Sequence, residues 1–147
     1  RFAAYHERPT THEYHGKAYG LYGFVQQLLW KENPEAEDCG QGIGFFAEYG
    51  WAAKDRFEVE DFVGGGLRWQ GPIPERDDDI MGLGVFNIYF SDQAGFTDHS
   101  ETAVELFYKV QLTGWMALQP DVQYITNPGG DGKRNAIAVG GRVELVF

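Results

Sequence analysis

The sequence predicts an all-β protein whose strands form an antiparallel meander. The final segment, 136–147, alternates apolar side chains with small or charged ones, and a period of two is that of a β-strand. Other segments alternate in the same way, and the polar stretches between them suit connections between consecutive antiparallel strands. Glycine contributes 20 residues and aromatic residues 16% of the chain, which fits tight turns and strands with aromatic ends.

The predicted strands are unusually long. Strands of soluble proteins most often have about 5–6 residues, whereas a tilted strand needs about 9–11 residues to cross a bilayer. The pattern therefore indicates strands of a transmembrane β-barrel. The predicted elements are a partial strand at 2–6 and long strands at 18–31, 42–54, 57–70, 80–91, 101–112, 115–125 and 136–147.

The phase of each strand decides which side chains share a face. The phase of 18–31 is ambiguous because Gln26 and Gln27 put an amide on each face, and the phase of 80–91 is also less clear than that of the other strands. In the first we favour an outward face with Tyr22, Phe24, Leu28 and Trp30. In the second we favour Phe86, Ile88 and Phe90 outward, with Asn87 and Tyr89 inward.

The remaining strands alternate clearly, with two special features. The run Gly64–Gly65–Gly66 excludes a helix on propensity, and within a strand it permits bending or the close approach of another group. Pro120 lacks a ladder donor, so we expect a bulge there.

The connections show turn chemistry rather than ligand sites. Cys39 is the only cysteine, so an internal disulfide is impossible, and an incidental thiol is favoured over intermolecular pairing. His12 and His15 lack further ligands for a metal. The aspartates at 77–79 and the stretch 127–132 are interpreted as solvated turns rather than calcium sites. No cofactor or metal is predicted, and the net charge of −10 argues against binding nucleic acid.

Four tryptophans lie near predicted strand ends, as anchors at membrane interfaces do. If the carboxyl terminus is periplasmic, Trp30, Trp69 and Trp115 lie at the periplasmic interface and Trp51 at the outer one. A soluble β-sandwich would more often place tryptophan in the middle of a strand.

Several blocks of sequence resemble the carbohydrate-selective porins of the OprB family. The closing blocks LQPDVQYITNPGGD and NAIAVGGRVELVF are similar to the C-terminal signature of that family. GGGLRWQGPIPERDDD, GLGVFNIYFSD and ETAVELFYKVQLTGW resemble upstream blocks in the same order. The likeness extends over nearly all of the chain from Ala18.

The resemblance implies a bacterial outer-membrane barrel of roughly sixteen antiparallel strands through which sugars diffuse. Residues 1–147 then form the C-terminal half of a single porin domain, and an N-terminal half with the partner strands and the constriction loop is expected elsewhere. Phe147 is the expected assembly signal. The implied partners are carbohydrate solutes, outer-membrane lipid and the missing half of the barrel, while the oligomeric state is left open.

The lumen is expected to be lined by polar residues that can exchange hydrogen bonds with sugar hydroxyls. Phe46, Phe107 and Tyr89 could stack on sugar rings. The other interpretation is that the acids and bases only pair across strands. The predicted lining consists of Glu48, Arg68, Glu105, Lys109, Gln119, Asp121, Gln123, Arg142 and Glu144.

No arrangement typical of catalysis is present in the sequence, so the chain is not predicted to be an enzyme. No serine lies in a nucleophile-elbow context, and no glycine motif opens a phosphate-binding helix. Two alternatives stay open: a soluble β-barrel that binds small molecules, and an outer-membrane barrel with an anchoring or enzymatic role.

Overall fold

A computed structural model describes residues 18–35 and 41–147 of the chain. The strands in chain order are β1 (Gly20–Lys31), β2 (Gly42–Ala52), β3 (Val59–Gln70), β4 (Ile80–Phe90), β5 (Ser100–Thr113), β6 (Met116–Thr126) and β7 (Ala136–Leu145). A short 3-10 turn, η1 (Pro128–Gly130), precedes β7. In this part of the chain no helix is long and apolar enough to cross a membrane.

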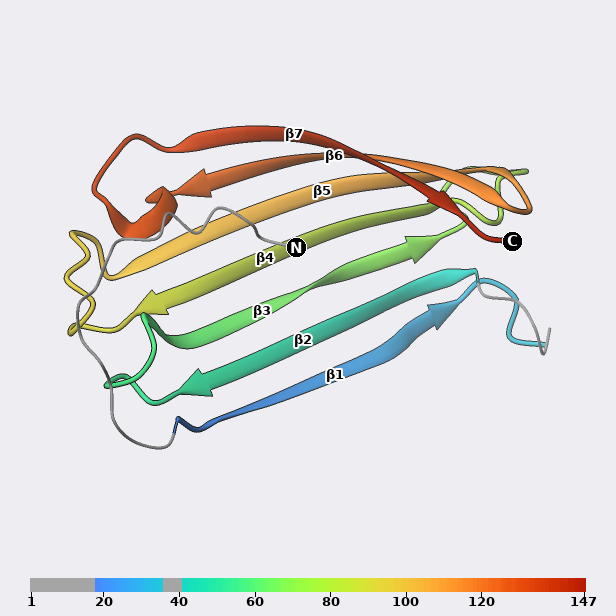
Figure 1. Ribbon diagram of the computed structural model, residues 1–147. Coiled ribbons are helices and arrows are strands. Elements are labelled where there is room, and N and C mark those ends of the chain that lie inside the picture. Colours follow the sequence, from blue (N-terminus) through green and yellow to red (C-terminus); the bar gives the residue numbers. More distant parts are fainter. Residues whose placement is uncertain (1–17, 36–40) are drawn as a thin grey trace.

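The strands form one sheet in sequence order, each antiparallel to its neighbour (Figure 1). This confirms the predicted all-β meander, and each long strand lies within a few residues of its predicted bounds. The partial strand predicted at 2–6, together with His12, His15 and Cys39, lies outside the described residues.

The connections lie at two ends of the sheet. The end that holds the connections 32–41, 71–79 and 114–115 is here the proximal end, at the right of Figure 1, together with the carboxyl terminus. The opposite end, with connections 53–58, 91–99 and 127–135, is the distal end.

The register of the ladders divides the side chains into two faces. One row pairs Glu48, Gly64, Phe86, Ala103, Ile125 and Ala136 across β2 to β7. The face that contains this row is the inner face. The neighbouring row pairs Ala47, Gly65, Val85, Val104, Tyr124 and Ile137, and its face is the outer face.

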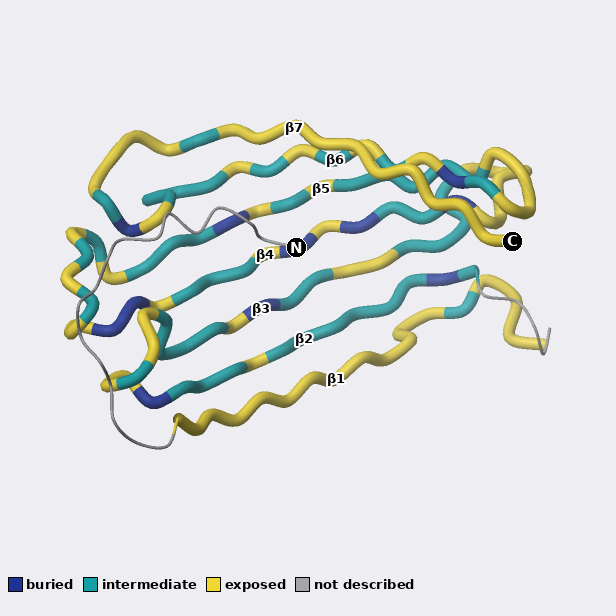
Figure 2. The backbone as a smooth tube through the Cα atoms, in the orientation of Figure 1, coloured by how far each residue is buried: buried dark blue, intermediate teal, exposed yellow. Residues whose placement is uncertain are grey.

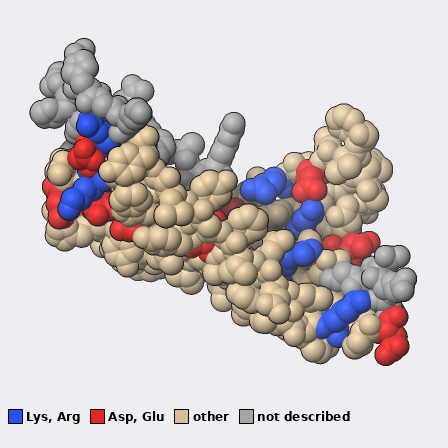
Figure 3. Space-filling view, turned by 90° about the horizontal axis from the view of Figure 1, so that it is seen from below, with Lys and Arg blue, Asp and Glu red and all other residues tan. Residues whose placement is uncertain are grey.

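The inner face is concave. Lys109 of β5 binds Glu144 of β7, across the intervening strand β6. The rings of Phe46 in β2 and Phe86 in β4 are 6.1 Å apart across β3. Contacts between side chains two strands apart, across about 9.5 Å, are favoured on the inside of a curved sheet. Figure 3 shows acidic and basic side chains in the hollow and at the strand ends, while the outer side between those ends is largely free of them.

The sheet is a single layer with almost no hydrophobic core. Of the hydrophobic residues that the structure describes, those buried are Ala53, Phe90, Ala103 and Ala117. The two edge strands, β1 and β7, are exposed along nearly their whole length (Figure 2). A layered soluble domain buries one face of each sheet against another element. Within the described residues, these strands have no such partner.

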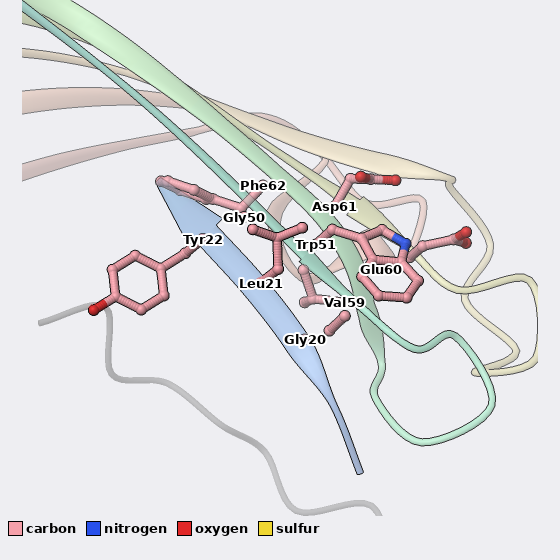
Figure 4. A pocket seen from close by; sticks show the side chains of 10 residues that line it. Gly20, Leu21, Tyr22, Gly50, Trp51, Val59, Glu60, Asp61 and Phe62 are labelled. Carbon is pink, nitrogen blue, oxygen red and sulfur yellow. The ribbon is translucent and has the colours of Figure 1, made fainter. Parts of the chain in front are cut away.

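The structure corrects the favoured phase of β1. Tyr22, Phe24 and Leu28 pair with Gly50, Glu48 and Gly44, and therefore lie on the inner face rather than outward. Figure 4 shows Tyr22 on the opposite side of β1 from Leu21 and Trp51. A register shift between Leu28 and Trp30 then returns Trp30 to the outer face, opposite Ile43.

The favoured phase of β4 is also wrong. Phe86 and Ile88 pair with Gly64 and Phe62 on the inner face, whereas Tyr89 pairs with Asp61 on the outer face. Asn87, the polar residue that seemed to mark the inner face, lies outward and donates a 2.6 Å hydrogen bond from Nδ2 to Thr102 Oγ1. A cross-strand partner on the outer face therefore accepts from the amide nitrogen of Asn87, while its buried Oδ1 has no hydrogen-bond partner among the described residues.

Pro120 causes no bulge. The pairing of β5 with β6 keeps one register from Phe107 opposite Asp121 to Val110 opposite Leu118, on both sides of the proline. On its other side, Pro120 pairs in register with Gly141 of β7. The ladder loses a donor at Pro120 without inserting a residue.

One aspartate of the turn 71–79 is not solvated, contrary to expectation. Asp79 is 1% exposed, while Asp77 and Asp78 are exposed. The Asp79 carboxylate accepts hydrogen bonds from the Arg76 guanidinium at 2.5 and 3.0 Å, from the Tyr108 hydroxyl at 2.7 Å and from the Gln111 backbone N–H at 2.8 Å. These bonds, those from Arg76 first, lower the pKa of Asp79 to about 2.

Asp79 thus ties the start of β4 to β5 at the proximal end. At the distal end, Ser91 donates a 2.7 Å hydrogen bond to the Lys54 carbonyl and its N–H donates to the Glu58 carbonyl at 2.8 Å. The backbone N–H groups of Thr97 and Asp98 both donate to the carbonyl of Gly130. Loops at both ends therefore hold neighbouring strands together.

Candidate permeation surface

All nine residues that the sequence predicts as pore lining share the inner face. They come from β2, β3, β5, β6 and β7, and the ladder registers place them on the same side of the sheet. The structure brings most of them together on β5 to β7, while two stand apart on β2 and β3. The set on β5 to β7 is Glu105, Lys109, Gln119, Asp121, Gln123, Arg142 and Glu144, and the other two are Glu48 and Arg68.

An ion pair crosses the strand β6. Lys109 Nζ lies 3.0 Å from both carboxylate oxygens of Glu144. On the intervening strand, Ala117 pairs with Glu144 and is 2% exposed. Nearer the distal end, Gln123 Nε2 donates to Glu105 Oε2 at 3.2 Å. Part of the polar surface is therefore satisfied by cross-strand partners.

Other polar groups of this surface stay open to water. Arg142 pairs in register with Gln119 and is exposed. Asp121 lies over Gly140, where an added Cβ would overlap its carboxylate. On β3, Arg68 donates a 2.7 Å hydrogen bond to Gln70 Oε1 and is also exposed. Such groups can donate to or accept from a passing solute.

The inner face of β1 to β4 has a different character. Phe46, Phe62 and Phe86 form a cluster, with ring centroids 6.1 Å apart for Phe46 and Phe86 and 6.2 Å apart for Phe62 and Phe86. Phe107 of β5 lies beside this cluster and packs over Gly82. The sequence indicated Phe46 and Phe107 as inward aromatics, but the phase error on β4 hid Phe86.

The outer face carries exposed aliphatic side chains along the middle of the strands. Leu67, Leu83, Leu106 and Val122 form a row across β3 to β6, and their exposure ranges from 41% to 49%. In water such a continuous apolar surface would be unfavourable, at about 25 cal/mol per Å². A hydrocarbon environment removes that penalty.

Aromatic residues border this aliphatic band at both ends. Trp30 and Trp69 both pair with Ile43 near the proximal end, and Trp115 lies in the proximal turn. Trp51 lies at the distal end of β2, with its ring 5.9 Å from that of Tyr19.

Sequence reasoning missed a row of outer-face tyrosines at the distal end: Tyr49, Tyr89 and Tyr124. Tyr49 donates a 2.5 Å hydrogen bond to Asp61, and the Tyr124 hydroxyl accepts one of 2.8 Å from Asn135. Tyr49 and Tyr124 therefore combine an apolar ring with a hydrogen-bonded hydroxyl near the distal end, which suits a membrane interface. In the sequence, these tyrosines could have been recognised as interface residues because each lies within three residues of a strand end.

The carboxyl terminus lies beside the proximal turn. The backbone N–H of Val146 donates a 2.9 Å hydrogen bond to the Trp115 carbonyl, and the side chain of Phe147 is fully exposed. Among the described residues, no group of three or more His, Cys, Asp or Glu could hold a metal ion.

A curved one-layer sheet with an apolar outer face, aromatic borders and a wet inner face is part of the wall of a membrane β-barrel. Membrane-spanning structures must satisfy their backbone hydrogen bonds internally. Within the described sheet, β2 to β6 have a neighbouring strand on each side, whereas β1 and β7 are paired on one side.

A family model for the carbohydrate-selective porins, the OprB family, matches residues 3–147. The chain belongs to this family, and it is an outer-membrane β-barrel segment. This confirms the resemblance seen in the sequence.

Two relatives illustrate the match. A protein named porin B from Pseudomonas aeruginosa is 28% identical over 154 residues, covering 90% of this chain and 33% of that protein. The structure of OprB from Pseudomonas putida at high pH superposes with a TM-score of 0.81 at 24% identity, covering 90% of this chain and 36% of that chain. The chain therefore spans about a third of the length of these relatives, and its sheet has the fold of a segment of the OprB barrel.

Proposed function

We propose that this chain forms part of the wall of a channel through which carbohydrates diffuse passively across the outer membrane, and that it is not an enzyme. The observation that carries the proposal is the opposition of the two faces. An exposed aliphatic band faces outward, and acids, bases, amides and aromatic rings face inward. Membership of a porin family supports the same function.

The nine inner-face residues act as weak, repeated hydrogen-bonding sites for sugar hydroxyls. A sugar hydroxyl both donates and accepts, so it can exchange partners with Arg142, Asp121 and the amides of Gln119 and Gln123 as it sheds water. Conduction requires sites that attract the solute without holding it. The Lys109–Glu144 pair keeps charge in the lumen with little net field.

Further strands close the barrel. The outer edges of β1 and β7 have no strand partner in the part of the chain that the structure describes, and unpaired strand edges are not stable in lipid. We propose that the domain continues around the lumen to roughly sixteen strands, with Phe147 as the assembly signal at the periplasmic end. The tryptophans at 30, 51, 69 and 115 and the distal tyrosines then lie at the two lipid interfaces.

The direct test is permeation. Liposomes containing the complete barrel are expected to swell faster in neutral sugars than in charged solutes of equal size, because the mixed-sign lumen offers hydrogen bonds without a strong field. Equal rates would remove carbohydrate selectivity from the proposal. Recovery of the native protein in a soluble fraction without detergent would remove the channel itself.

A further inference from the structure

Four inner-face glycines of β3 and β4 lie beneath phenylalanine rings. Gly64, Gly82 and Gly84 are buried, although they belong to a single-layer sheet. Phenylalanine rings cover them: Phe107 from β5 covers Gly82, and Phe86 covers both Gly64 on the neighbouring strand and Gly84 on its own strand. A Cβ atom on Gly64 would lie 2.5 Å from Phe86 Cδ1, and one on Gly84 would lie 2.7 Å from Phe86 Cε2.

The same arrangement repeats on each side of Phe86. A Cβ on Gly82 would overlap the ring of Phe107, and one on Gly66 would lie 2.9 Å from Phe46 Cε1. The rings of Phe46, Phe86 and Phe107 are themselves only half-buried. One side of each ring therefore rests on glycine backbone, and the remaining surface faces the lumen.

Any side chain at Gly64, Gly82 or Gly84 would push a ring off the wall. Contacts below 3.0 Å force a shift, and at these three positions the nearest obstructing atoms belong to the rings. At Gly66 the Leu83 carbonyl also obstructs, so that position is less informative. Because the inner face is concave, a displaced ring moves into the lumen.

We infer that Gly64, Gly82 and Gly84 contribute to the bore of the channel along this part of the wall, and so to the size limit for sugars, by letting Phe86 and Phe107 lie close against the wall. This inference rests on the proposed function, since it assigns a size filter to the same lumen. It gives the Gly64–Gly65–Gly66 run a role in permeation as well as in strand geometry.

The test substitutes Gly82→Ala in the complete porin, reconstituted in planar bilayers and liposomes. We expect a several-fold lower ion conductance and a size dependence of sugar uptake that becomes steeper from monosaccharides to trisaccharides. Gly50→Ala is the matched control on the same face. A Cβ there would meet Phe62 Cβ and Tyr22 Cβ at 3.9 Å and the Leu21 carbonyl oxygen at 4.0 Å, which are ordinary van der Waals contacts, so both readouts should match the wild type.

A double-substitution cycle identifies the ring as the cause. Phe107→Ala should raise the conductance, and adding Gly82→Ala to it should change nothing further, because no ring is left to displace. If Gly82→Ala assembles normally and conducts like the wild type, the inference is wrong. If Gly82→Ala does not assemble, the test rests on the conductance of Phe107→Ala. Unchanged conductance in Phe107→Ala would then overturn the inference.

Ion conductance also separates this inference from the proposed function. If the wild-type protein conducts salt but admits no sugar, the proposed carbohydrate channel fails. The effect of Gly82→Ala on salt conductance still reports whether the glycines contribute to the bore.

Discussion

The two halves of the inner face hold their side chains in different ways. On β1 to β4, phenylalanines rest on glycines of the adjacent strands, and ring contacts such as Phe62 with Phe86 connect them. On β5 to β7, some charged side chains bind partners on other strands, as Lys109 binds Glu144 across β6, and others, such as Arg142, stay open to water. We call these the aromatic half and the charged half.

The comparison shows that one curved wall can separate two tasks. Rings held close against the wall contribute to the width of the lumen, while charged side chains contribute to its electrostatic field. The seam between the halves is the β4–β5 pairing, with Phe107 over Gly82 on the inner face and Asp79 at its proximal end.

The largest expected effect is a loss of stability when the hydrogen bonds of Asp79, which join the start of β4 to β5, are removed. Asp79→Ala leaves the Tyr108 hydroxyl and the Gln111 N–H without their acceptor, which should lower the free energy of unfolding by about 2–4 kcal/mol. The measurement is urea unfolding of the complete barrel in lipid vesicles. Asp78→Ala, an exposed neighbour in the same turn, is the control, and equal losses for both variants would contradict a special role of Asp79.

The same carboxylate predicts a pH dependence. Folding lowers the pKa of Asp79 to about 2 from an ordinary value near 3.9. Its contribution to stability is therefore fully present above about pH 4 and is lost as the pH falls through about 2. The stability difference between wild type and Asp79→Asn should shrink across that interval. A difference that stays constant down to pH 2 would show that the charge of Asp79 does not stabilise the fold.

A smaller effect, on ion selectivity, is expected when a charge is removed from the charged half of the inner face. Lys109→Gln leaves Glu144 unpaired in the lumen and should raise the cation-to-anion permeability ratio several-fold, with little change in stability since exposed pairs contribute about 0–1 kcal/mol. Reversal potentials under a salt gradient measure the ratio. Lys133→Gln removes the same charge from a distal loop, where the ratio should not change. An equal shift in both variants would mean that net charge, rather than position in the lumen, governs selectivity.

The smallest effect is expected in the aromatic half. Phe62→Leu removes one ring of the stacked pair with Phe86 and should slow sugar entry by a factor of roughly two, which corresponds to about 0.4 kcal/mol. Liposome swelling measures the rate. The reversal potential should stay at the wild-type value, because no charge changes. A shift in ion selectivity in Phe62→Leu would contradict the assignment of ion selectivity to the charged half alone.

Alternation with charges on one side was enough to predict β5, β6 and β7 and their faces. Glu105, Lys109 and Arg142 cannot face hydrocarbon without a large cost, so their phase follows from chemistry. β4 contains no charged residue that would fix its phase in this way. Its single amide, Asn87, found a partner in Thr102 on the outer face, and only the pairing of Phe86 with Gly64 shows which side faces the lumen.

The sequence by itself therefore determined the all-β meander, the bounds of its strands and the polar inner face of β5 to β7, because side-chain period and the cost of charge in lipid are local properties. The tertiary structure decided the phase of β1 and β4, the burial of Asp79 and the placement of phenylalanine rings on glycine. These depend on which residue lies opposite in the next strand. Such pairings join residues that are distant in sequence, and the pattern within a strand specifies them only weakly where its two faces are chemically similar, as in β1 and β4.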